Sequence, residues 1–170
     1  MMSRKRKIRA VVSLGSNIEP RLEHLSKAVD MLSKLPQTRL VAKSSVIETE
    51  GVDVPAEFAD MKFLNAAAVF ETELSALEFS RRMHAVEDAL GRVRTVRNGP
   101  RTIDIDLVDF GGLRMETPEL TLPHPRARLR DFVMRPLSEL GLADILSSKE
   151  FREDGEMPCG IQPATVLPLP

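Results

Sequence analysis

A short segment near the middle of the chain carries two carboxylates at a spacing that suits metal chemistry. Its residues are Ile103, Asp104, Ile105, Asp106 and Leu107. This alternation of apolar and acidic residues is typical of a β-strand, so both aspartates project from one face while the aliphatic side chains are buried on the other. Two carboxylates on one face can bind hard divalent cations, most often magnesium beside substrate phosphates.

An arginine-rich segment lies just before this strand. It contains Arg92, Arg94, Arg97 and Arg101, with a turn signal at Gly99-Pro100 and no acidic residue. The guanidinium group is a planar fork of donors that suits phosphate oxygens. Each feature alone has a plain structural explanation, namely a solvated loop or an incidental pair of aspartates. Because the loop leads directly into the strand, the two together favour phosphoryl-type transfer from a nucleotide.

The composition is that of one globular domain. The chain has 170 residues, of which 42% are hydrophobic and 29% charged, and its formal net charge is −1, which argues against a general polyelectrolyte binder. We expect a domain over residues 1–146 and a polar, then proline-rich, extension over 147–170. The single Cys159 excludes an internal disulfide. The lack of a signal-peptide pattern and of a long apolar run predicts a cytoplasmic protein with no membrane partner.

Apolar periodicity predicts the elements that must position these side chains. We expect strands over residues 8–14, 38–48 and 63–72, a helix that begins at Pro20, and a second helix that begins at Ser75 and ends at Gly91. With the aspartate-bearing strand added, the order is β-α-β-β-α-β. This is an α+β, ferredoxin-like arrangement, in which both helices pack on one face of an antiparallel sheet and leave the other face for the site.

The strand over residues 63–72 predicts which side chains share that second face. Leu64, Ala66, Ala68 and Phe70 lie on the expected helix side, whereas Phe63 and Asn65 lie on the other. If the aliphatic residues of the aspartate-bearing strand also pack under the helices, the opposite face gathers Phe63, Asn65, Asp104 and Asp106. Such a group describes a small polar site, and the alternative is that Asn65 is only a solvated strand residue.

The segment after the last strand holds further cationic side chains. His124 lies between two prolines, which predicts a rigid loop, and from this context its role is either structural or phosphate-binding. The arginines that follow are Arg126, Arg128, Arg130 and Arg135. Their spacing cannot place all four side chains in one direction, so only some can serve one site.

Common nucleotide-binding patterns are absent from the sequence. There is neither a Walker P-loop nor a G-x-G-x-x-G pattern. Polymerase-type nucleotidyltransferases place their carboxylates shortly after a Gly-Ser pair. Here the interval from Gly15-Ser16 to the aspartates is close to ninety residues, so that match is poor.

Five motifs in order resemble the 6-hydroxymethyl-7,8-dihydropterin pyrophosphokinase family of folate biosynthesis. They are LGSN (14–17), FLNAA (63–67), E-x-x-x-GRVR (87–94), RNGPRTIDID (97–106) and LPHPR (122–126). The resemblance runs from about Ile8 to about Asp144, and RNGPRTIDID meets the family's signature at every constrained position. It implies a ferredoxin-like fold and transfer of the β,γ-diphosphate of ATP to the pterin hydroxymethyl group, with release of AMP. A monomer is the expectation.

The resemblance also implies roles for individual residues. Asp104 and Asp106 would hold two magnesium ions, and with Arg92 and Arg101 they would form the catalytic set. The residues expected to bind ATP are Arg92, Arg94, Arg101, His124 and Arg130. The residues expected to bind the pterin are Thr49, Val52, Phe63, Asn65 and Phe132, with the phenylalanine rings stacking on the heterocycle and Asn65 bonding its edge. Glu87 would position a loop or the substrate.

Three positions depart from the family's pattern. Asn98 stands where some relatives carry a tryptophan, and the arginine-rich loop is one residue shorter. Gly51 and Asp53 replace a proline and a glycine. These changes bear on loop closure and pterin affinity more than on the chemistry.

Two other functions compete with the pyrophosphokinase hypothesis. A ferredoxin-like RNA-binding module would use the Arg92–Arg101 loop, but such modules stack bases on several aromatic residues of the open sheet face. Only Phe63 is expected there, so no nucleic-acid partner is predicted. An inactive homologue that serves as a structural partner is disfavoured, because both carboxylates and the loop arginines are present.

Overall fold

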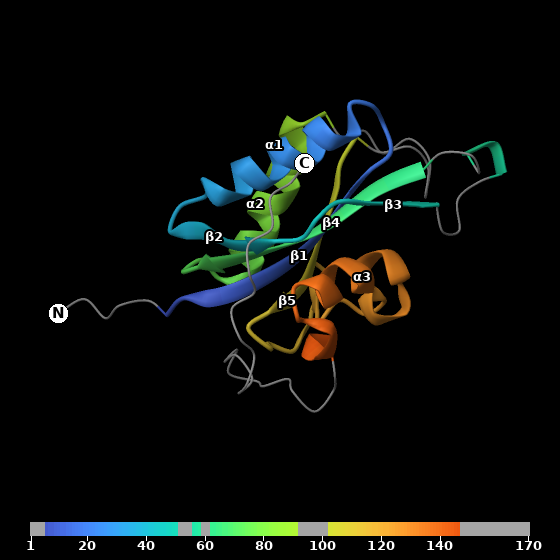
Figure 1. Ribbon diagram of the computed structural model, residues 1–170. Coiled ribbons are helices and arrows are strands. Elements are labelled where there is room, and N and C mark those ends of the chain that lie inside the picture. Colours follow the sequence, from blue (N-terminus) through green and yellow to red (C-terminus); the bar gives the residue numbers. More distant parts are fainter. Residues whose placement is uncertain (1–5, 51–55, 59–61, 92–101, 147–170) are drawn as a thin grey trace.

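An antiparallel sheet forms the centre of the computed structural model, which describes residues 6–50, 56–58, 62–91 and 102–146 (Figure 1). The strands are β1 (Ile8–Ser16), β2 (Thr38–Lys43), β3 (Ile47–Glu50), β4 (Lys62–Thr72) and β5 (Asp104–Phe110). Their order across the sheet is β2-β4-β1-β5, and β3 pairs with the first part of β4. The two central strands, β4 and β1, come from distant parts of the sequence.

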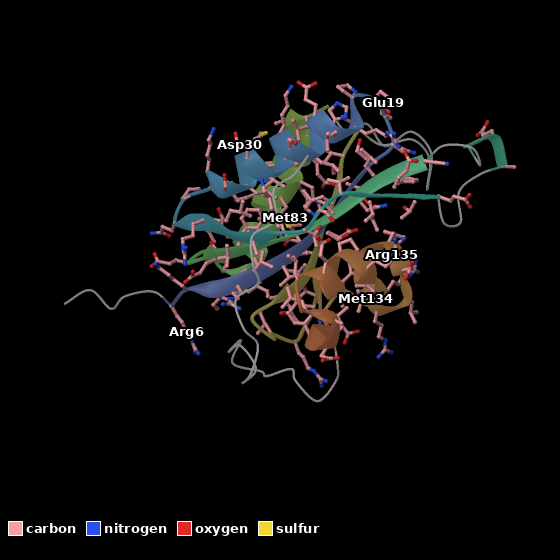
Figure 2. All side chains as sticks on the ribbon, in the orientation of Figure 1. Arg6, Glu19, Asp30, Met83, Met134 and Arg135 are labelled. Atoms are coloured by element: carbon pink, nitrogen blue, oxygen red, sulfur yellow. The ribbon has the colours of Figure 1, made fainter. Side chains whose placement is uncertain are left out.

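Two helices, α1 (Arg21–Ser33) and α2 (Ala76–Ala89), cover one face of this sheet (Figure 1). Between helices and sheet, the Phe79 ring lies 6.2 Å from Phe70 and 6.1 Å from Phe110, measured between ring centroids. Figure 2 shows Met83 in the same layer, whereas the charged side chains of Glu19 and Asp30 project outward. The expected α+β, ferredoxin-like fold with an antiparallel sheet is confirmed.

Local capping accounts for the bounds of α2. Ser75 Oγ accepts a hydrogen bond from the backbone N–H of Glu78 at 3.2 Å, which satisfies one of the donors left free at a helix start. Gly91 follows the helix with φ +85°, a conformation that side chains disfavour. Both ends lie where the sequence predicts them.

The single strand expected over residues 38–48 is wrong, because the chain forms two strands there. β2 and β3 both pair with β4, and residues 44–46 separate them. Ser44 causes the break: its Oγ accepts the N–H of Ala67 at 2.9 Å, in place of a backbone carbonyl. A side chain that takes over a ladder bond lets the backbone change direction. This change of direction sets the course of β3 along the site.

A third helix, α3 (Asp131–Glu139), packs on the second face of the sheet, where the sequence pattern predicts no helix. Val133 and Leu137 of α3 form a second core with Val11 and Val69 of the sheet. Pro136 lies inside this helix, and a proline there argues against a helix when the sequence is read alone. A two-stranded hairpin, β6 (Met115–Glu116) with β7 (Thr121–Leu122), follows β5. Part of the face expected to be open is therefore covered.

Within the described ranges, every helix is too short or too polar to cross a membrane.

Candidate active site

Three neighbouring strands place the expected site residues in rows on the sheet face opposite α1 and α2. Gly15 of β1 pairs with Asn65 of β4 on one side and with Asp104 of β5 on the other. The next row consists of Ala67, Ser13 and Asp106. Opposed residues in a ladder share a face, so two strand spacings, about 10 Å, separate the backbones of Asn65 and Asp104. Between them β1 contributes only small residues, Gly15 and Ser13, which we call the β1 floor.

Asp104 and Asp106 project from the same face of β5, as predicted, while Ile103, Ile105 and Leu107 are buried under the helices. The Asp106 side chain is 34% exposed, so solvent and ligands can reach it. Among the described residues, no group of three or more His, Cys, Asp or Glu side chains forms a metal site from protein atoms alone. Magnesium typically takes one or two carboxylates and completes its octahedron with water and substrate phosphates. A pair of accessible carboxylates fits that requirement.

Glu87 holds the backbone of β5 between the two aspartates. It is 1% exposed, and its Oε2 accepts the N–H of Ile105 at 3.0 Å. Its other oxygen, Oε1, lies 2.7 Å from Nδ1 of His84. A buried carboxylate is stable only when such partners compensate for lost hydration. The role left open for Glu87 by the sequence is thus to position the strand that carries both aspartates.

His124 lies beside Asp106 at the end of a rigid segment. Its backbone N–H donates to Val108 O at 2.9 Å, and its Nδ1 accepts the N–H of Arg126 at 3.2 Å. Burial, with a smaller contribution from the Arg130 charge, lowers the pKa of His124. The neutral ring therefore keeps its proton on Nε2, which lies 3.9 Å from Asp106 Oδ1. This arrangement offers a donor next to the carboxylates.

The other end of the site is built around a buried carboxamide. Asn65 is 3% exposed, so it is not the solvated strand residue that the sequence also allowed. Its Nδ2 donates to Thr49 Oγ1 at 2.6 Å, and Thr49 pairs with Phe63 in the β3–β4 ladder. This end of the site therefore combines an aromatic ring with polar atoms that a flat heterocycle can bond.

The start of α3 carries two of the expected site residues, Arg130 and Phe132. The Arg130 guanidinium carbon lies 5.7 Å from the centroid of the Phe132 ring, a cation–π distance. Phe132 is half-buried and packs against the second core. One helix start thus supplies both a cation expected to bind phosphate and an aromatic ring expected to bind the pterin.

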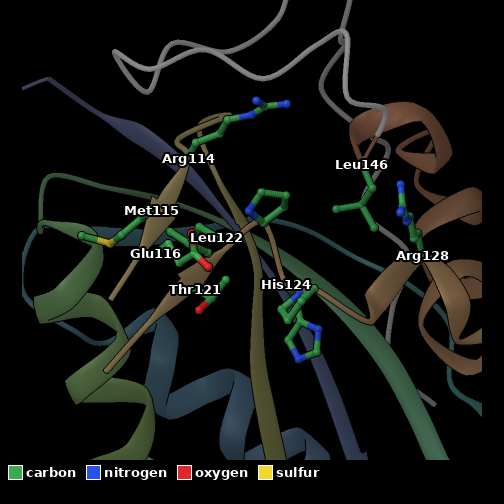
Figure 3. Close-up of a pocket in the computed structure, with 10 residues that line it drawn as sticks. Arg114, Met115, Glu116, Thr121, Leu122, His124, Arg128 and Leu146 are labelled. Atoms are coloured by element: carbon green, nitrogen blue, oxygen red, sulfur yellow. The ribbon is translucent and has the colours of Figure 1, made fainter. Parts of the chain in front are cut away.

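Two cavities flank the segment from Thr121 to Pro125. The smaller, about 190 Å³, includes Asp106, His124 and His84 in its lining. The larger, about 480 Å³, is lined by the β6–β7 hairpin, by Arg114 and Arg128, and by Leu146 (Figure 3). The smaller cavity includes only one of the two aspartates, Asp106, and extends from it toward Ser80 and Met83 of α2.

The remaining expected residues lie outside the described ranges. They are Val52, Arg92, Arg94 and Arg101, together with the departures at Gly51, Asp53 and Asn98. Conversely, the sequence reading gave no site role to Gly15, Ser13 or His84. The cross-strand register was the missing information, because motif spacing along the chain does not tell which residues of β1 lie between Asn65 and Asp104.

The sequence matches a known family over most of its length. The family is described as 7,8-dihydro-6-hydroxymethylpterin-pyrophosphokinase (HPPK), and the match covers residues 11–142. The Pseudomonas aeruginosa 2-amino-4-hydroxy-6-hydroxymethyldihydropteridine pyrophosphokinase is 38% identical over 132 residues, 78% of this chain and 80% of that protein. The Bacillus subtilis enzyme of the same name is 39% identical and the match covers 77% of each chain.

Solved structures show the same fold. Wild-type Plasmodium falciparum HPPK-DHPS with pteroate aligns with a TM-score of 0.60 at 13% sequence identity, over 81% of this chain and 39% of that one. An HPPK-DHPS in complex with substrates aligns with a TM-score of 0.56 at 11% identity, over 94% of this chain and 42% of that one. This chain thus spans about two-fifths of those longer proteins.

Proposed function

The chain belongs to the 7,8-dihydro-6-hydroxymethylpterin-pyrophosphokinase family, and on that premise we propose that it makes a pterin diphosphate for folate biosynthesis. The reaction transfers the β,γ-diphosphate of ATP to 6-hydroxymethyl-7,8-dihydropterin. The hydroxymethyl oxygen forms a bond to the β-phosphorus, the bond from that phosphorus to the α-phosphate oxygen breaks, and AMP leaves. One observation carries the proposal: Asn65 and Asp104 flank the β1 floor on one sheet face.

Asp104 and Asp106 are the residues that would hold two magnesium ions. When bound, magnesium neutralises charge on the phosphates. The protein's own contribution is a rigid frame, since Glu87 fixes the strand between the carboxylates. Such transfers depend on positioning and electrostatics more than on a general base, and no side chain is assigned that role.

The nucleotide is proposed to occupy the smaller cavity. His124 Nε2 is a neutral donor beside Asp106, suited to a phosphate oxygen, and Arg130 adds positive charge nearby. Arg92, Arg94 and Arg101 are proposed to close over the triphosphate, as the family resemblance implies, and Arg92 and Arg101 to act in the transfer itself.

The pterin is proposed to lie over the Thr49–Asn65 end. Asn65 and Thr49 give its edge hydrogen-bonding partners, and Phe63 and Phe132 stack on its faces. Val52 is the fifth residue proposed to bind the pterin. The distance of about 10 Å between the Asn65 and Asp104 backbones leaves room for a flat ring between the carboxamide and the metal-binding carboxylates.

The RNA-binding alternative gains no support from the fold. An RNA platform of this class uses the open face of the sheet, and α3 covers part of that face.

The test is a product assay with the purified protein, ATP, magnesium and 6-hydroxymethyl-7,8-dihydropterin, with nucleotides separated by chromatography. We expect AMP that appears only when the pterin is present, in an amount equal to the pterin diphosphate. ADP as the nucleotide product would contradict diphosphate transfer and indicate an ordinary kinase. Asp144→Asn, which removes a carboxylate in the 143–146 turn far from β5 along the chain, serves as the control variant and should match the wild type.

A further inference from the structure

Gly15 is one of the two residues of the β1 floor, and its backbone conformation does not require glycine. The described glycines with positive φ are Gly91, Gly111, Gly112 and Gly141, and Gly15 is not among them. Glycine in the interior of a strand is less stable than alanine there, because it loses more backbone freedom on folding. Neither backbone conformation nor stability therefore accounts for glycine at this position.

The carboxamide of Asn65 occupies the space that a side chain at Gly15 would need. A Cβ added to Gly15 would lie 2.9 Å from Asn65 Oδ1, closer than real Cβ atoms approach an oxygen. The next neighbour, Leu64 O, would be 3.8 Å away, which is an ordinary contact. The conflict is thus confined to one side chain, and the backbone of β4 could accept alanine.

Asn65 cannot move away from Gly15 without losing its other contact. Its Nδ2 is held by Thr49 Oγ1 at 2.6 Å, and Oδ1 on the opposite side of the same planar group lies over Gly15. Rotation of the carboxamide away from a new Cβ would also move Nδ2. The carboxamide of Asn65 therefore has one orientation. Thr49 binds its Nδ2, and the space left by the missing side chain of Gly15 accommodates its Oδ1.

We propose that Gly15 is a positioning residue for the pterin and acts through Asn65. The space left by its missing side chain lets the carboxamide lie across β1 with Oδ1 presented to N–H groups of a flat heterocycle. This inference rests on the proposed function, because it assigns Gly15 to the acceptor end of that same site. It also separates the two substrates: Gly15 serves the pterin, while ATP depends on β5, His124 and the arginines.

Gly15→Ala tests the inference through a difference between substrates. We expect KM for the pterin to rise about tenfold, the effect of one misplaced hydrogen-bonding group, while KM for ATP changes less than about twofold. Calorimetric titration with the pterin alone should show the same weakening. Pterin binding equal to the wild type would overturn the inference. If the wild type neither binds the pterin nor releases AMP, the proposed function itself fails, and the two failures are thereby distinguished.

A double-mutant cycle with Asn65→Ala tests whether Gly15 acts through the carboxamide. Once the carboxamide is gone, adding Gly15→Ala should weaken pterin binding by no more than about twofold, because the two changes remove the same interaction. Additive losses would overturn the inference. Should Gly15→Ala alone fail to fold, the double variant should recover the melting temperature of Asn65→Ala, and failure to recover it would contradict a clash confined to Asn65.

Discussion

At the residue scale, the polar side chains of the candidate site are held in place by hydrogen bonds to neighbouring groups. Glu87 accepts the N–H of Ile105, which lies between the two proposed metal ligands. Thr49 accepts from Asn65, a proposed pterin ligand. His124 follows the same principle, since the Arg126 N–H determines which ring nitrogen can donate. Pre-organised groups of this kind stabilise a transition state without reorganising during the reaction.

Asp104→Ala should lower the rate of pterin-dependent AMP formation by several orders of magnitude. The reason is the loss of a charged oxygen ligand, since metal stabilisation of phosphoryl transfer amounts to several kcal/mol. The measurement is single-turnover AMP release at saturating ATP and magnesium. Asp104 is partly exposed, so the melting temperature should stay within a few degrees of the wild type. Near-normal turnover in a folded variant would contradict the assignment of Asp104 as a metal ligand.

At the element scale, β5 serves both the site and the core. Asp104 and Asp106 at its start face the site, whereas Val108 and Asp109, a few residues later, are buried. The register of β5 with β1 shifts between Val11 and Val12, so Val108 and Asp109 both lie at an irregularity. Asp109 is fully buried, and its Oδ1 has no hydrogen-bond partner in the described part of the chain. Burial raises the pKa of Asp109 to about 7, although N–H groups of Gly112 and Phe110 oppose the shift.

Asp109 should make the protein less stable as the pH rises. In the unfolded chain the pKa of Asp109 is about 4. Between about pH 4 and 7, the Asp109 carboxyl is therefore protonated in the folded state and ionised in the unfolded state. The free energy of unfolding falls as the pH rises through this range, by on the order of 4 kcal/mol in all. Above pH 7 Asp109 is ionised in both states, and the free energy of unfolding falls no further on its account. Asp109→Asn, which resembles the protonated form, should remove most of this slope in urea unfolding measured from pH 5 to 8. Asp144→Asn should keep it, and a wild-type slope in Asp109→Asn would show that another group is responsible.

At the scale of the whole molecule, the sheet separates two hydrophobic cores that hold different parts of the chain. One core, under α1 and α2, fixes the ferredoxin-like frame, and the other, under α3, holds the chain that carries His124, Arg130 and Phe132 against the sheet. The Glu139 carboxylate accepts from Ser45 N–H at 3.1 Å and from its hydroxyl at 2.7 Å. The end of α3 is thereby attached to the chain between β2 and β3.

Truncation after Leu146 should leave fold and activity intact. Ile145 and Leu146 are the last members of the second core in the described part of the chain, and the family match ends at residue 142. We expect a melting temperature within a few degrees of the full chain and AMP release within about twofold. Loss of activity would show that the 147–170 extension contributes to the site. Truncation after Leu140, which also removes Leu142, should destabilise the protein by several kcal/mol.

Sequence alone determined the parts of this protein that depend on local periodicity and on contiguous motifs. The strand pattern around Asp104 and Asp106, the ends of α2 and the family resemblance follow from neighbours along the chain, and each is borne out by the fold or by the family match. Only the tertiary structure decided the rest. The break at Ser44, the helix that contains Pro136, and the place of Gly15 under Asn65 depend on contacts between distant segments. Spacing along a chain carries no information about cross-strand register or about which face a later helix will cover.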